Sequence, residues 1–138
     1  MAGLPFEFII DGPPISQQAR SRAQLQTWKS AVRAEAMKRW PVGEPPVDCA
    51  VSITIVYYHD GPTVTIDDDN MAKPIRDALN GLVYRDDNLI TDSKVRKTDV
   101  NGLFYPRGMS DVLASGFVRN RQFVYVRVEF APSHERLL

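Results

Sequence analysis

The sequence has 138 residues, of which 43% are hydrophobic and 25% charged, and these values exclude a collagen-like, coiled-coil or disordered chain. Lysine plus arginine and aspartate plus glutamate both number 17, so the net charge of zero gives no bulk indication of a nucleic-acid or membrane partner. The best apolar run, residues 49–58, is too short to span a bilayer, and the opening residues lack the basic and apolar regions of a signal peptide. We therefore expect one domain, residues 1–138, in the cytoplasm.

The first half of the chain predicts a strand, a helix and a second strand. Residues 5–10 favour a short strand that ends at the glycine- and proline-rich turn 11–14. Residues 17–40 predict a helix whose apolar face repeats at helical spacing. That face consists of Leu25, Trp28, Val32 and Ala36. Residues 47–58 are rich in β-branched and aromatic side chains and predict a strand, in which the lone Cys49 is a small core residue.

The second half predicts a helix and two further strands. Residues 63–69 are expected to be extended, and a helix follows over residues 71–79, because Pro74 is best accommodated near the start of a helix. Strands over residues 89–100 and 123–130 complete the sheet. The order β-α-β-α-β-β predicts an α+β domain with a mixed or antiparallel sheet.

Residues 101–121 do not fit this pattern and are expected to form an irregular loop insertion, with one short helix near Asp111–Ala114. A loop of this length is uncommon in a compact domain and is often functional. We expect its aromatic residues, Phe104, Tyr105 and Phe117, to pack the loop, and an exposed one that inserts into a DNA junction is the alternative.

Charge is unevenly distributed along the chain. Residues 20–40 and 93–127 each carry a net charge of +5, whereas residues 60–92 between them carry a net charge of −5. An acidic segment can hold metal cations, and basic segments beside it can attract a polyanion. Solvated charge on three surfaces would explain the same pattern.

The run Asp67-Asp68-Asp69-Asn70 is the strongest local indication of chemistry. In an extended segment Asp67 and Asp69 would face the same way, about 6–7 Å apart, and could bracket a hard cation such as Mg²⁺. Lys73 can reach the same space, and one acid of Asp86-Asp87 could complete a metal site if the chain folds back. Such a set suits metal-dependent phosphodiester hydrolysis, in which Mg²⁺ activates water and a lysine offsets negative charge. Taken alone, three consecutive aspartates favour a solvated turn.

A longer stretch, residues 67–87, resembles the signature of the RusA-like Holliday-junction resolvases. That signature runs D-x-D-N, a lysine three residues on, D-A-L-x-G and then D-D, and every element is present here in order. The turn at residues 12–14 and the polar, basic residues after it also resemble the N-terminal G-x-P turn and loop of that family. The resemblance covers most of the chain up to about residue 97, plus the final strand.

The resemblance implies a RusA-like fold with helices on one side of the sheet. It also implies a homodimeric, Mg²⁺-dependent endonuclease that cuts four-way DNA junctions by paired nicks, with Mn²⁺ as a possible substitute. Asp67, Asp69 and Asp87 match the catalytic, metal-binding carboxylates of the family, and Lys73 matches its catalytic lysine. Asp86, beside the second acidic position, is expected to assist at the metal.

Several basic and polar side chains are candidates for contacts with DNA phosphates. They are Gln17, Gln18, Arg20, Arg22, Lys94, Arg96, Arg119 and Arg121. For Lys94 and Arg96, protection of an edge strand is the alternative. Asn70 and Asp77 belong to the signature and are assigned orienting or structural roles, since Lys73 and Asp77 form an i,i+4 helix pair that needs no function.

Three other functions remain open from the sequence. The same site could act on flaps, forks or linear duplex DNA. The acids could instead form a structural cation site in a DNA-binding protein that does not cleave, although such a site has no need of Lys73. The chain could also be a structural domain whose aspartate run is a turn.

Overall fold

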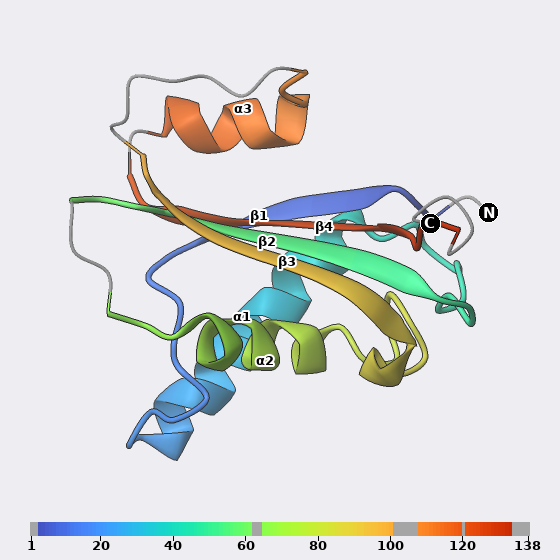
Figure 1. Ribbon diagram of the computed structural model, residues 1–138, viewed down its shortest axis with the longest axis horizontal. Coiled ribbons are helices and arrows are strands. Elements are labelled where there is room, and N and C mark those ends of the chain that lie inside the picture. Colours follow the sequence, from blue (N-terminus) through green and yellow to red (C-terminus); the bar gives the residue numbers. More distant parts are fainter. Residues whose placement is uncertain (1–2, 62–64, 101–107, 120, 134–138) are drawn as a thin grey trace.

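A four-stranded mixed sheet forms the centre of the computed structural model, which describes residues 3–61, 65–100, 108–119 and 121–133 (Figure 1). The strands are β1 (Phe6–Asp11), β2 (Val51–His59), β3 (Ile90–Asp99) and β4 (Phe123–Phe130). Their order in the sheet is β1-β4-β2-β3, with β4 antiparallel to both of its neighbours and β3 parallel to β2. The predicted α+β class with a mixed sheet is confirmed.

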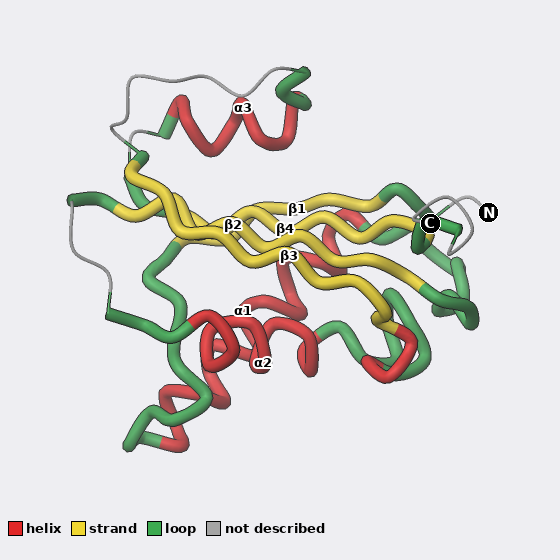
Figure 2. Tube along the Cα trace, in the orientation of Figure 1, coloured by secondary structure: helices red, strands yellow, loops and turns green. Residues whose placement is uncertain are grey.

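Helices lie on both faces of this sheet. Helices α1 (Arg22–Arg39) and α2 (Asp68–Ala78) cover one face, and α3 (Asp111–Val118) lies over the opposite face, as Figures 1 and 2 show. The expected one-sided arrangement therefore holds for α1 and α2 but not for α3. Within the described residues, no helix is long and apolar enough to cross a membrane.

The main core lies between the sheet and the two helices α1 and α2. The four side chains predicted for the apolar face of α1 are the four that it buries. The helix begins at Arg22, five residues later than predicted, because the Ser21 side chain accepts a hydrogen bond from the Gln24 amide and caps it. Residues before Ser21 form the loop that follows β1.

Helix α2 begins at Asp68, earlier than the sequence predicted, so Asp68 and Asp69 form its first turn. Acidic side chains are favourable there because the helix N-terminus carries partial positive charge. Pro74 lies inside the helix and leaves the Asn70 carbonyl without its usual partner four residues on. The Gln17 amide donates a hydrogen bond to that carbonyl at 2.8 Å, so the helix continues through the proline.

The described part of residues 101–121 contains a helix of eight residues, longer than the short one predicted. Helix α3 buries Leu113 and Gly116, and Phe117 packs edge-on against Tyr58 and Phe123. This small second core explains why the segment is not wholly irregular. Phe104 and Tyr105 lie outside the described residues.

Candidate active site

Lys73 links the two acidic segments of the sequence. Its ammonium Nζ lies 2.9 Å from an oxygen of Asp77 and 3.3 Å from an oxygen of Asp87. The contact with Asp77 is the predicted i,i+4 pair, whereas Asp87 lies fourteen residues further along the chain. Lys29 of α1 lies 3.9 Å from the other oxygen of Asp77 and extends the charged cluster to a second helix.

A tight turn after α2 brings Asp87 back toward the helix. Gly81 has a φ of 77°, a left-handed conformation that glycine adopts at little cost, and its amide donates to the Tyr84 carbonyl at 2.8 Å. The single 3₁₀ turn η1 (Asp87–Leu89) then leads into β3. The Asp86 side chain caps η1 by accepting a hydrogen bond from the Asn88 amide at 2.9 Å, which fixes the position of Asp87.

A polar cleft of about 610 Å³ lies between α2, β3 and the loop after β1. Helix α2 contributes Asp69, Lys73 and Arg76, which are spaced four and then three residues apart and so share one face. Ser93 of β3 and Gln17 of the loop also line the cleft. Arg76 and Ser93 were not among the site residues predicted from the sequence, although helical spacing from Asp69 would have indicated Arg76.

The charges at this cleft are mutually stabilised. Partial burial would raise the pKa of Asp87, but its interactions with Asp86 and with the Lys73 ammonium outweigh burial and hold that pKa below the ordinary aspartate value. The hydrogen bond to Asp77 raises the pKa of Lys73, despite some opposing desolvation. At neutral pH the pair is therefore a carboxylate and an ammonium, and Lys73 is suited to stabilise negative charge rather than to accept a proton.

The four predicted metal ligands are not gathered around one point. Asp67 is the N-cap of α2 and Asp69 lies in its first turn, so the same-side geometry of an extended segment, on which the pairing was predicted, does not apply. Asp86 and Asp87 lie beyond the other end of the helix. Among the described residues, no group of three His, Cys, Asp or Glu side chains is placed to hold a metal ion.

Asp68, the middle acid of the triplet, has a structural partner. The Lys97 ammonium lies 3.1 Å from its carboxylate and donates a hydrogen bond to the Ile66 carbonyl at 2.7 Å. Lys97 thus attaches the start of α2 to β3. Asp67 makes no capping hydrogen bond with its side chain to the described helix, and both Asp67 and Asp69 are exposed.

The loop after β1 brings one group of the predicted DNA contacts to the cleft. Gln17 lines the cleft, and an Arg22 guanidinium nitrogen donates to the Gln17 carbonyl at 3.4 Å. Gln18 and Arg20 are exposed on the same loop. Of these four residues, Gln17 lines the cleft and Arg22 contacts Gln17, so this loop borders the cleft.

The other predicted DNA contacts lie elsewhere. On β3, Lys94 and Arg96 alternate with the cleft residue Ser93 and so point to the opposite face of the sheet. Burial raises the pKa of Tyr58, and the nearby charge of Arg96 opposes that rise. Because Tyr58 belongs to the small core under α3, Arg96 lies on the α3 face of the sheet.

Arg119 and Arg121 also lie away from the cleft. Both form ion pairs with Asp11 at the end of β1, and the Arg121 Nε lies 3.8 Å from the carboxylate. Their charges are therefore partly compensated within the protein.

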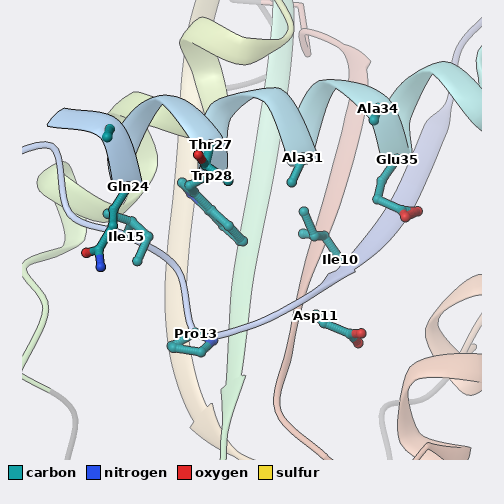
Figure 3. Close-up of a pocket in the computed structure, with 11 residues that line it drawn as sticks. Ile10, Asp11, Pro13, Ile15, Gln24, Thr27, Trp28, Ala31, Ala34 and Glu35 are labelled. Atoms are coloured by element: carbon teal, nitrogen blue, oxygen red, sulfur yellow. The ribbon is translucent and has the colours of Figure 1, made fainter. Parts of the chain in front are cut away.

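A second hollow, of about 740 Å³, lies between α1 and the loop after β1. Figure 3 shows Trp28 extending from α1 toward the sheet, with Pro13 and Ile15 on the loop segment beside it. Its lining is mostly apolar, and its charged side chains, Asp11 and Glu35, are both acidic. This hollow is unsuited to a phosphate, so the polar cleft beside α2 is the candidate active site.

An α+β domain with aspartates, a lysine and an arginine around one polar cleft has the features of a nuclease. A comparison with protein-family models matches residues 14–103 to Endodeoxyribonuclease RusA. The match covers more than half of the chain and includes α1, α2 and the whole cleft. The chain belongs to the RusA endodeoxyribonuclease family and is a hydrolase that acts on DNA. This family acts on Holliday junctions and is in general metal-dependent. A search of the curated proteins found no match.

Proposed function

We propose that the protein is a Mg²⁺-dependent resolvase that cuts four-way DNA junctions by paired nicks, acting as a homodimer. Family membership supports the reaction class. The observation that carries the proposal in this chain is the Lys73 ammonium, which joins Asp77 and Asp87 at the edge of a cleft lined by Asp69. Two coordinated nicks need two such sites, which is why a dimer is part of the proposal.

The residues present fit a magnesium ion by the chemistry of their donor atoms. Asp67, Asp69 and Asp87, with Asp86 beside them, offer carboxylate oxygens, which Mg²⁺ and Mn²⁺ prefer. When bound, the ion would supply an activated water and a counter-charge for the leaving oxygen. Lys73, held in place by Asp77, would stabilise the negative charge that develops on the phosphate.

The loop after β1 is proposed to guide DNA into the cleft. It is attached to α2 through the hydrogen bond from the Gln17 amide to the Asn70 carbonyl, so Gln17, Gln18, Arg20 and Arg22 keep a fixed position relative to the acids. Phosphate contacts of this kind orient a nucleic acid without reading its sequence. Lys94, Arg96, Arg119 and Arg121 would serve the outer arms of a junction, since they lie on other surfaces.

The test is cleavage of a labelled four-way junction and of a linear duplex of equal length, with Mg²⁺ and with EDTA. We expect symmetric nicks in the junction only, and only with Mg²⁺. Asp69→Asn should lower the cleavage rate at least about a hundredfold while leaving junction binding largely intact. The matched control is Asp48→Asn, an exposed aspartate paired with Arg85 outside the cleft, which should cut at the wild-type rate.

Other outcomes would change the assignment in defined ways. Equal cleavage of flaps, forks or duplex would make this a nuclease of broader specificity. Binding without cleavage in either Mg²⁺ or Mn²⁺ would indicate a DNA-binding protein with a structural cation site. Wild-type cleavage by Asp69→Asn would show that the catalytic site is elsewhere.

A further inference from the structure

Of the two basic residues that line the cleft, Lys73 and Arg76, only Arg76 lacks a carboxylate partner in the described part of the chain. It lies on α2 three residues after Lys73 and seven after Asp69, and it lines the same cleft as both. Its Nε is buried, yet it has no hydrogen-bond partner among the described residues. A buried donor without a partner costs roughly 1–3 kcal/mol, so such a group calls for a partner that binds later.

The contrast with Lys73 shows what that partner would be. Two carboxylates, those of Asp77 and Asp87, already contact the Lys73 ammonium. Arg76 forms no ion pair within the described part of the chain. Asp69 and Lys73, on the same face of α2, line the same cleft. A guanidinium in this setting matches the geometry and charge of a phosphate, to which it can donate two hydrogen bonds.

We propose that Arg76 binds a DNA backbone phosphate in the cleft and thereby sets which phosphodiester bond lies against Asp69 and Lys73. This inference rests on the proposed function. Along the helix axis, Arg76 is about 10 Å from Asp69 and about 4–5 Å from Lys73, given a rise of about 1.5 Å per residue. The bound phosphate is therefore a neighbour of the one that is cut, and Arg76 is a positioning residue.

The backbone of Arg76 is held independently of its side chain. The Tyr84 hydroxyl, which is fully buried, donates to the Arg76 carbonyl at 2.6 Å. Burial raises the pKa of Tyr84 far above its ordinary value, so the hydroxyl remains a donor. A side-chain substitution at position 76 leaves this bond in place, which makes Arg76 suitable for mutation.

The experiment compares Arg76→Ala, Arg76→Gln and Arg76→Lys with the wild type and with Arg85→Ala, an exposed arginine outside the cleft. Binding of a labelled four-way junction is measured in EDTA over a series of salt concentrations. We expect Arg76→Ala to weaken binding about tenfold and to lower the slope of log K against log salt by about 1. Arg76→Lys should keep the wild-type slope, and Arg85→Ala should leave both affinity and slope unchanged.

Mapping the nicks with Mg²⁺ supplies the readout that a merely structural residue would not change. Arg76→Ala should spread the nicks over neighbouring phosphates, whereas Arg85→Ala should keep the wild-type positions. If Arg76→Ala does not fold, Arg76→Gln, which removes the charge, is compared with Arg76→Lys, which keeps it. Wild-type affinity, salt slope and nick positions in the charge-removing variants would overturn the inference. If the wild-type protein neither binds nor cuts junctions, the proposed function itself fails.

Discussion

Lys73 contacts two carboxylates, and the sequence alone cannot show which contact is important for function. Its pair with Asp77 is an ordinary i,i+4 helix contact, and half of the Lys73 side chain is exposed, so the pair adds little to stability. Its contact with Asp87 connects residues from two separate elements across the edge of the cleft. Exposed pairs of this kind contribute only about 0–1 kcal/mol, so the contact with Asp87 adds little to stability. It leaves the Lys73 ammonium at the edge of the cleft, where the proposed function places its role.

Tyr125 on β4 predicts a pH dependence of stability that is independent of the cleft. Burial and a hydrogen bond from its hydroxyl to Glu7 raise the pKa of Tyr125 to about 12 from 10.0, although Arg127 opposes the rise. A folded pKa above the unfolded one stabilises the protein fully below about pH 10, and the contribution is lost as the pH rises through about 12.

We expect the free energy of unfolding of the wild type to fall between about pH 10 and 12, and that of Tyr125→Phe to fall less. Denaturant unfolding of both proteins is measured over this range, and the difference between them removes the contribution of the lysines that titrate there. At pH 7 the variant should lose about 1 kcal/mol, for one hydrogen bond to Glu7. A constant difference between the two proteins from pH 7 to pH 12 would contradict the prediction.

At the scale of whole elements, helices and strands were predictable where apolar side chains repeat. The buried face of α1 and the bounds of β4 match the sequence prediction. The start of α2 does not, because its continuation through Pro74 depends on the Gln17 amide, more than fifty residues away in the sequence. No local sequence pattern contains that hydrogen bond, so the predicted helix start, residue 71, is three residues too late.

The candidate site was predictable to the same extent. The acids, Lys73 and the loop with Gln17 are visible as a signature, and the structure brings Lys73, Asp69 and Gln17 to one cleft. The sequence could not show which carboxylate Lys73 would contact, nor that Lys94 and Arg96 would point away from the cleft. Both depend on the parallel pairing of β3 with β2 around α2.

A substitution in helix α3 is expected to lower the stability of the protein without changing its cleavage rate. A Cβ atom at Gly116 would overlap the ring of Phe123, which is fully buried. Alanine improves helix propensity by about 1 kcal/mol, but overpacking of this kind costs about 1–3 kcal/mol. We expect Gly116→Ala to lower the free energy of unfolding by about 1 kcal/mol and the melting temperature by a few degrees.

The matched control is Val118→Ala on the same helix, since Val118 is exposed and its truncation should be neutral or slightly stabilising. Well below the melting temperature, Gly116→Ala should cut DNA at the wild-type rate because α3 lies on the face of the sheet opposite the cleft. A folded variant with a greatly reduced cleavage rate would indicate that α3 takes part in the reaction.

At the scale of the whole molecule, the net charge of zero is the sum of separate acidic and basic segments. The acidic segment, residues 60–92, supplies α2 at the cleft and Asp87, which contacts Lys73 there. The basic segments lie before and after it in the sequence. Arg22 contacts Gln17 at the cleft, whereas Lys94 and Arg96 lie across the sheet. A four-way junction has arms that extend beyond one active site, so separated basic surfaces can serve it even though one subunit is neutral.

The proposed paired nicking by a homodimer predicts how a mixed dimer will behave. If each subunit cuts one strand, a dimer of one wild-type subunit and one Asp69→Asn subunit retains a single working cleft. On a supercoiled plasmid with a cruciform, wild-type dimers should give linear product within one binding event, since nicks on opposite strands break the circle. The mixed dimer, purified through two different affinity tags, should give nicked circles at about half the initial rate and very little linear product.

A doubly tagged wild-type dimer controls for the tags. Linear product from the mixed dimer at the wild-type rate would show that one cleft makes both nicks, and the requirement for a dimer would then be lost.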